Sequence, residues 1–151
     1  MITVKKEGVI LRSTDLPFEN DSVLNPAVIR EGDSVYMFYR AVRTGNYSSI
    51  GFCKFHGPLN LIERSTSPIL VPEFEYESHG MEDPRIVKIG DTFYLTYIAF
   101  DGATAHGALA TSKDLKHFDK QGIITPKIKI NDFKSIVQPM EKVTNKYFSM
   151  N

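Results

Sequence analysis

The sequence contains no tryptophan and only one cysteine, Cys53, among its 151 residues. A single cysteine excludes an internal disulfide, and the absence of CxxC or Cys/His spacing argues against a thiolate zinc site. Basic and acidic residues number 18 each, so no net charge attracts the chain to nucleic acid or to an anionic membrane. We therefore expect no nucleic-acid partner, and we expect Cys53 to fill space in the core.

Long apolar runs are also missing. No stretch approaches the roughly 18 apolar residues of a membrane-spanning helix, and the N-terminal MITVKKEG has no signal-peptide apolar segment. These features predict a cytoplasmic protein without a membrane partner. The sequence has no GxSxG elbow and no Gly-rich phosphate loop. The histidines do not have metal-binding spacing, so no metal site is expected; they are His56, His79, His106 and His117.

The aromatic residues are ten Phe and seven Tyr, gathered in short runs between Gly, Pro, Asn and Asp. This distribution is typical of β-strands. Apolar residues alternate or run continuously, and they do not recur at helical spacing over three turns. With 42% hydrophobic residues the chain can bury the core of one domain. The sequence predicts an all-β fold, with strands over 27–29, 35–39, 49–55, 93–97, 107–112 and 122–124, and with a further strand that follows Pro84.

An internal repeat organises the chain. The segment 83–97, DPRIVKIGDTFYLTY, matches 25–39, NPAVIREGDSVYMFY, including the Gly-Asp turn and the tyrosines. A weaker third copy runs from Gln138 to Met150. Repeats of this length, made of short strands, indicate the blades of a β-propeller. We therefore interpret 1–151 as a single unit of about two and a half blades, with repeats that start near residues 25, 83 and 138.

Each copy has a polar residue directly before its proline: Asn25, Asp83 and Gln138. The innermost strand of every blade lines the central channel of a propeller, so these residues would converge at one mouth. They could instead cap strand starts. In the second copy Glu82 and Arg85 also crowd around the proline. Neighbouring carboxylates favour proton binding by one of them, which suits a proton donor, although a turn with an Arg–carboxylate pair is an alternative.

Four segments of the sequence are characteristic: LNPAV at 24–28, YRA at 39–41, GMEDPRI at 80–86 and LATSKDL at 109–115. Together they resemble glycoside hydrolase family 130. The family contains β-mannoside phosphorylases and related β-mannosidases, which are five-bladed β-propellers. The resemblance covers most of the chain from about residue 24 onward. An Asp-Pro pair before a strand, taken alone, also resembles the furanosidase propellers of families 43 and 32.

The resemblance implies that Asp83 is the catalytic acid. It further implies that Asn25 and Arg40 bind the sugar where the bond breaks, and that Glu82 and Arg85 flank the acid. The reaction implied is inverting phosphorolysis of a β-mannoside or related oligosaccharide to mannose 1-phosphate. Inorganic phosphate would be the co-substrate, with no other cofactor. Because phosphate is already anionic, such a reaction needs one essential carboxylate together with cationic and hydrogen-bonding groups.

Other residues have two interpretations each. Asp101 lies at a blade end and could bind a sugar hydroxyl or hold a turn. His79 and His106 are candidates for the pocket wall or for surface loops. Tyr39 and Tyr97 would pack in the core or line the channel, where a ring face can contact a sugar.

Two other functions stay open. The first is hydrolysis of a β-mannoside or furanoside, in which a further carboxylate would activate water. The second is a non-catalytic sugar-binding or assembly fragment. A complete family member is longer than this chain, and an open propeller edge is an aggregation hazard. We therefore expect an N-terminal part that is completed by a missing C-terminal half or by a homo-oligomer, and that is inactive alone.

Overall fold

The computed structural model describes residues 3–126 of the chain. Strands account for most of its regular structure, and the only helix in this part is the one-turn 3₁₀ helix η1 (Glu75–Glu77). The described residues contain no helix that is long and apolar enough to cross a membrane. The strands are β1 (Ser22–Glu31), β2 (Ser34–Arg43), β3 (Tyr47–His56), β4 (Asn60–Arg64), β5 (Gly80–Ile89), β6 (Thr92–Phe100), β7 (Ala105–Ser112) and β8 (Asp119–Ile123).

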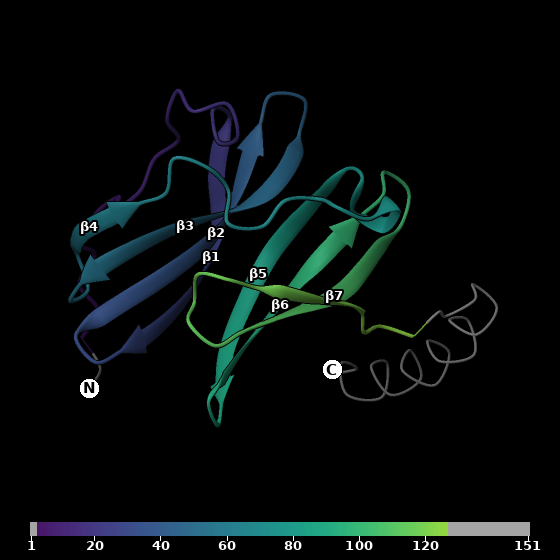
Figure 1. The fold of residues 1–151 in the computed structure, drawn as a ribbon. Helices are drawn as coiled ribbons and strands as arrows, with labels where there is room; N and C mark the ends of the chain where they lie inside the picture. Colours follow the sequence, from purple (N-terminus) through teal and green to yellow (C-terminus); the bar gives the residue numbers. More distant parts are fainter. Residues whose placement is uncertain (1–2, 127–151) are drawn as a thin grey trace, which may run out of the picture.

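The strands form two antiparallel units side by side (Figure 1). Strands β1 to β4 make blade 1, and β5 to β8 make blade 2, each strand pairing with the next along the chain. A single parallel bridge, Ser48 with Gly80, joins β3 to β5. The fold is an open part of a β-propeller. The third copy of the repeat, from Gln138, lies outside the described residues.

The sequence predicted every strand of this part except β4. The expected Gly-Asp hairpin turns lie between β1 and β2 and between β5 and β6, with Gly32 at φ 60° and Gly90 at φ 58°. These left-handed positions favour glycine. Strand β4 pairs with β3, although its residues are mostly exposed and include Asn60, Glu63 and Arg64. An outer strand has little apolar surface to bury, so its sequence can be as polar as that of a loop. The sequence of β4 therefore did not distinguish it from a polar connection.

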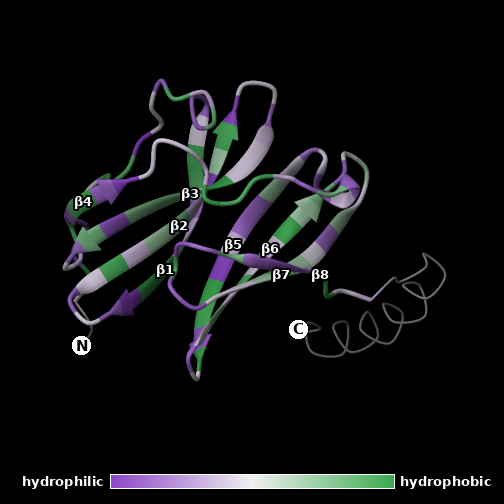
Figure 2. Ribbon diagram, in the orientation of Figure 1, coloured by the Kyte–Doolittle hydropathy of each residue, from purple (hydrophilic) through white to green (hydrophobic). Residues whose placement is uncertain are grey.

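The main core lies between the two blades. Phe38, Ile50 and Phe52 of blade 1 pack with Leu95 and Tyr97 of blade 2, among other buried residues. Hydrophobic segments recur along β6, whereas β5 is hydrophilic in its middle (Figure 2). Alternate side chains of β6 are buried in this core, whereas those between them are half-buried on the other face of blade 2.

A second cluster covers the outer face of blade 1. It contains Met37, Tyr39 and Phe55, and the N-terminal segment contributes Leu11 and Phe18. Cys53 is fully buried in this cluster, where burial raises the pKa of its thiol to about 11. This position agrees with the expected role of Cys53 as a core residue.

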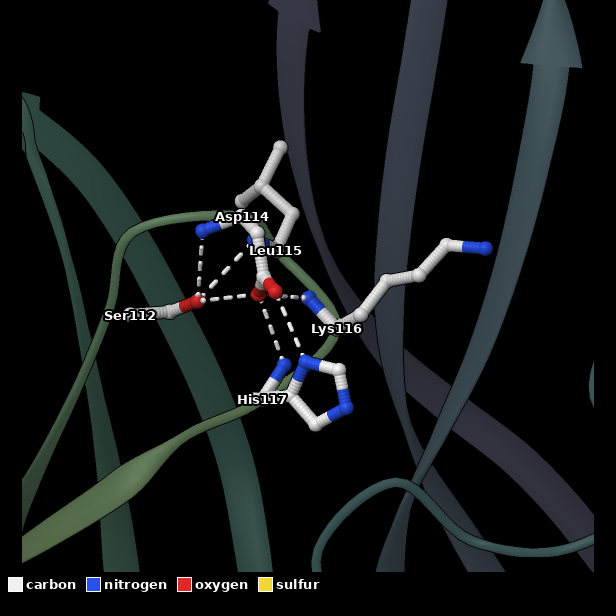
Figure 3. Close-up of polar contacts among 5 residues, drawn as sticks. All are labelled: Ser112, Asp114, Leu115, Lys116 and His117. Carbon is white, nitrogen blue, oxygen red and sulfur yellow. Dashed lines mark hydrogen bonds and ion pairs between the residues drawn. The ribbon is translucent and has the colours of Figure 1, made fainter.

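The segment after β7 is a tightly bonded turn (Figure 3). Asp114 Oδ1 accepts hydrogen bonds from the backbone N–H groups of Lys116 at 2.9 Å and His117 at 2.8 Å, and Asp114 Oδ2 lies 2.7 Å from His117 Nδ1. Ser112 Oγ accepts the N–H of Leu115 at 2.9 Å. The turn places Leu115, with φ 64° and 2% exposure, in the core between the blades. It therefore fastens blade 2 to blade 1.

The Asp114→Asn variant is expected to unfold at lower temperature than the wild type near neutral pH. The contact with His117, followed by the backbone N–H groups, holds the pKa of Asp114 below its ordinary value of 3.8. The stability that the carboxylate provides is therefore present above pH 3.8 and is lost as the pH falls through its folded-state value. Thermal unfolding measured from pH 7 to pH 2 should show the two proteins converging on acidification. Asp119→Asn, an exposed change nearby, is the control; a gap between Asp114→Asn and wild type that does not depend on pH would contradict the expectation.

Candidate active site

Asn25 and Asp83 occupy the same unusual backbone position in the two blades. Between Leu24 and Ala27 two residues of β1 oppose one residue of β2, and β5 repeats this bulge around Asp83. Asn25 has φ 46° and Asp83 has φ 48°, in the left-handed region where Asn and Asp are tolerated best among residues with a Cβ. The proline that follows each of them lacks an N–H, so the bulge costs no ladder hydrogen bond there.

The bulges bring these two side chains together. Asn25 Nδ2 donates a hydrogen bond to Asp83 Oδ1 at 2.5 Å. At the other end of the same strands, Lys88 Nζ of β5 lies 2.6 Å from Glu31 Oε2 of β1. The inner strands of the two blades therefore lie next to each other, without a shared backbone ladder and with polar contacts at both ends.

Arg40 of β2 connects this pair to blade 2. Its NH2 group donates to Glu82 Oε1 at 2.7 Å, its Nε donates to Ser48 Oγ at 2.8 Å, and its NH1 lies 3.8 Å from Asp83 Oδ1. The side chains of Arg40, Glu82 and Asp83 are 15%, 20% and 38% exposed. Four of the sequence-predicted site residues, Asn25, Arg40, Glu82 and Asp83, are thus gathered in one partly buried cluster.

Ser48 was not a sequence-predicted site residue, although its side chain holds the Arg40 guanidinium. Its backbone pairs with Gly80, in the parallel bridge that joins β3 to β5. Gly80 has φ 153°, and an added Cβ would lie 2.9 Å from the backbone nitrogen of Ser48. The glycine is therefore required both by its own backbone conformation and by the approach of Ser48, which explains why the GMEDPRI segment begins with glycine.

Arg85 and Asp101 lie outside this cluster. Arg85 is exposed, and its NH1 donates to the carbonyl of Pro84 at 2.7 Å. Asp101 Oδ1 accepts the backbone N–H groups of Ala103 at 2.8 Å and Thr104 at 2.6 Å, and these bonds lower the pKa of its carboxyl. Arg40 rather than Arg85 is thus the cation paired with Glu82, and Asp101 stabilises its own loop.

The aromatic candidates are packed against protein. Tyr39 and Tyr97 are 1% and 2% exposed, in the two core clusters. The His79 ring stacks on Tyr47 with centroids 5.4 Å apart. His106 borders an open hollow of about 620 Å³ with Asp101. Neither tyrosine therefore offers a free ring face within the described residues.

Sequence reasoning missed two buried carboxylates, Glu19 and Glu77, both 0% exposed. Glu19 lies six residues before Asn25, and Glu77 lies six residues before Asp83. The repeat therefore extends further towards the N-terminus than the matched segments, and this equal spacing was the signal that could have revealed them. Each glutamate contacts the tyrosine of its own blade, Tyr39 or Tyr97.

The cluster combines a carboxylate with hydrogen-bond donors and a positive charge. A half-exposed carboxylate, Asp83, lies beside an amide donor, Asn25, and a guanidinium, Arg40, which can bind hydroxyl groups and stabilise negative charge. The described residues contain no group of three His, Cys, Asp or Glu side chains able to hold a metal ion. The chemistry that Asp83, Asn25 and Arg40 themselves offer is proton transfer and hydrogen bonding.

The fold is part of a β-propeller, and the cluster lies where the inner strands of its two blades meet. Residues 5–150 match the glycoside hydrolase family 130 profile, described as beta-1,4-mannooligosaccharide phosphorylase. The chain belongs to this family.

Two curated relatives and one solved structure illustrate the likeness. A beta-1,2-mannobiose phosphorylase from Thermoanaerobacter sp. (strain X514) is 38% identical over 98 residues, which are 56% of this chain and 32% of the relative. A 1,2-beta-oligomannan phosphorylase from the same strain is 29% identical over 137 residues, or 82% and 46%. A glycosyl hydrolase structure from Bacteroides ovatus has a TM-score of 0.68 at 23% identity, covering 82% of this chain and 41% of that one. The chain spans less than half the length of each.

Proposed function

We propose that the chain carries the acid and part of the sugar pocket of an inverting β-mannoside phosphorylase that forms mannose 1-phosphate. The meeting of Asn25, Arg40, Glu82 and Asp83 across two blades is the observation that supports this most strongly. Asp83 would supply the proton for the leaving oxygen, directly or through a hydroxyl of the bound sugar. Its contacts with Asn25 and Arg40 both involve Oδ1, so the proton would be held on Oδ2.

Arg40 and Asn25 would bind the hydroxyl groups of the mannose whose bond breaks. Glu82 fixes the Arg40 guanidinium at 2.7 Å, so it is engaged as an ion-pair partner rather than free to activate water. Inverting hydrolysis needs a second carboxylate as base, whereas phosphate needs only cationic and hydrogen-bonding groups to hold it. Glu82 is therefore not available as this base within the described cluster, and the curated relatives are phosphorylases, which supports phosphorolysis over the hydrolytic alternative. Further blades that complete the ring would supply the phosphate-binding cations.

The assay uses a protein with a complete ring that contains these residues. The protein is incubated with β-1,2-mannobiose or with β-1,4-mannobiose in phosphate buffer, and mannose 1-phosphate is measured. We expect it to form from at least one of the two linkages. Arg40→Ala should weaken sugar binding, raising KM by about tenfold or more, because a hydrogen bond to a charged group contributes about 1.5–3 kcal/mol.

Arg30→Ala, at an exposed hairpin position, is the matched control and should leave KM unchanged. Release of free mannose at a rate independent of phosphate would identify a hydrolase instead. No turnover of any mannoside by a folded protein that still binds the sugar would favour the non-catalytic alternative.

A further inference from the structure

The two blades contain the same buried arrangement of a glutamate, a tyrosine and a cation. In blade 2, Glu77 Oε1 accepts the hydroxyl of Tyr97 at 2.6 Å, and Glu77 Oε2 lies 2.7 Å from Lys120 Nζ. Lys120 is 4% exposed. We call these three residues the blade 2 triad. They are almost fully enclosed, so their charges interact without much screening by water.

The blade 1 triad consists of Glu19, Tyr39 and Arg64. The Tyr39 hydroxyl donates to Glu19 Oε2 at 2.7 Å, and Arg64 NH2 lies 2.8 Å from Glu19 Oε1. The cation differs between the blades, but the glutamate–tyrosine contact is the same. Burying charged groups carries a large desolvation cost, so two equivalent triads in a small protein call for an explanation beyond filling the core.

The tyrosine of each triad lies opposite a bulge. In the pairing of β5 with β6, Glu82 lies opposite Ile98 and Arg85 lies opposite Thr96. Tyr97 is therefore the β6 residue that faces the bulged Asp83 and Pro84. The register of β1 with β2 places Tyr39 in the same relation to Asn25. The residue across from each left-handed position is therefore fixed by a buried hydrogen bond.

The glutamate of each triad precedes the same bulge in the chain. Glu77 lies in η1, shortly before β5, and its Oε2 also accepts the backbone N–H of Glu73 at 2.9 Å. It thus ties the segment leading into the inner strand to Tyr97 on the neighbouring strand. The Glu77–Tyr97 hydrogen bond therefore constrains both the chain that leads into the Asp83 bulge and the strand that pairs with it.

A left-handed backbone at a residue with a Cβ persists only where the surrounding structure determines it more than once. In each blade, an equivalent glutamate and tyrosine provide this additional constraint on the bulge. We propose that Glu77 and Glu19 are positioning residues, which hold Asp83 and Asn25 in the left-handed conformation through Tyr97 and Tyr39. The catalytic importance of this positioning rests on the proposed function, but the backbone effect does not.

The test measures the backbone of Asp83 by NMR in the 151-residue chain, so it needs no turnover. Couplings that depend on φ, together with residual dipolar couplings, should give a single positive φ for Asp83 in the wild type. In Tyr97→Phe and Glu77→Gln we expect this single solution to be lost, with a conformer at negative φ becoming populated. Failure of the proposed function would appear only in the mannoside assay.

Three further variants make the result specific. Tyr94→Phe removes a hydroxyl from the other face of the same strand and should leave φ at Asp83 unchanged. Lys120→Arg copies the cation of blade 1 and should also preserve it. Tyr39→Phe should disturb φ at Asn25 but not φ at Asp83. Asn25 and Asp83 are joined through a side-chain hydrogen bond, which does not fix the backbone of Asp83.

A positive φ at Asp83 that survives in Tyr97→Phe would overturn the proposal, even if the variant were less stable. Tyr97→Phe decides the matter should Glu77→Gln fail to fold, since it removes one hydroxyl and keeps the buried ion pair. Equal loss of the positive φ in the Tyr94→Phe control would also overturn it, because the effect would then be general loosening of the strand.

Discussion

Asp83→Asn is expected to reduce turnover by about 10²–10⁴-fold in a protein with a complete ring, the usual contribution of general acid catalysis. The asparagine keeps the shape of the side chain, and its oxygen can still accept the hydrogen bond that Asn25 donates to Asp83 Oδ1. It has no proton of carboxylic-acid strength to give to the leaving oxygen. The measurement is steady-state formation of mannose 1-phosphate, with sugar affinity determined separately by calorimetry.

The effect should appear in kcat, with sugar affinity and thermal stability close to those of the wild type. Asp91→Asn makes the same chemical change at the exposed hairpin position of β5 and β6 and should be neutral. A variant Asp83→Asn with near-normal phosphorolysis would remove Asp83 from the role of acid and leave the Arg40 cluster as a binding site.

The sequence was sufficient to predict the blades and the meeting of their inner strands. The Gly-Asp turns and the alternating aromatic runs are local signals, and the repeat by itself relates Asn25 to Asp83. Their side chains are in fact hydrogen-bonded to each other. Local patterns succeeded here because each hairpin contains its own turn and its own apolar face.

The partner of the acidic pair could not be predicted in the same way. Arg85 is adjacent to it in sequence, but the cation that pairs with Glu82 is Arg40, on a strand of the other blade. Such a contact depends on how two blades pack, and one sequence does not specify that geometry. The left-handed backbone at Asn25 and Asp83 was also missed, because a residue before proline is normally expected to be extended.

The buried glutamates show a signal that was present but not used. The spacing from Glu19 to Asn25 equals the spacing from Glu77 to Asp83. A glutamate in a polar loop is usually exposed, so composition favoured a surface position for both. Burial becomes possible only because a tyrosine and a cation, distant in sequence, supply the missing hydrogen bonds.

Lys120→Ala is expected to destabilise the protein by about 3–5 kcal/mol, the usual cost of removing one partner of a buried ion pair. Glu77 is 0% exposed and would keep its charge without a compensating cation. Lys120 Nζ also donates to the carbonyl of Val71 at 2.6 Å, so the segment before η1 would lose a second bond. Urea unfolding at pH 7 measures the change in free energy.

The destabilisation should depend on pH in a definite direction. Burial raises the pKa of Glu77, but the bonds from Lys120 and Tyr97 outweigh it and hold the pKa below the ordinary 4.5. In the wild type the stability from the ionised carboxylate is therefore present above pH 4.5 and is lost as the pH falls through the folded-state value. The variant lacks this contribution, so the difference between the two proteins should shrink on acidification.

Lys116→Ala is the matched control for this prediction. Lys116 Nζ lies 3.6 Å from Glu63 Oε1, and both side chains are exposed, at 55% and 44%. An exposed pair of this kind contributes about 0–1 kcal/mol, so the control should unfold at nearly the wild-type urea concentration. Because both variants replace the same residue type near the end of blade 2, their difference isolates burial of the partner carboxylate. Equal unfolding midpoints for Lys120→Ala and Lys116→Ala would show that the Glu77 charge is not stabilised by Lys120 in solution.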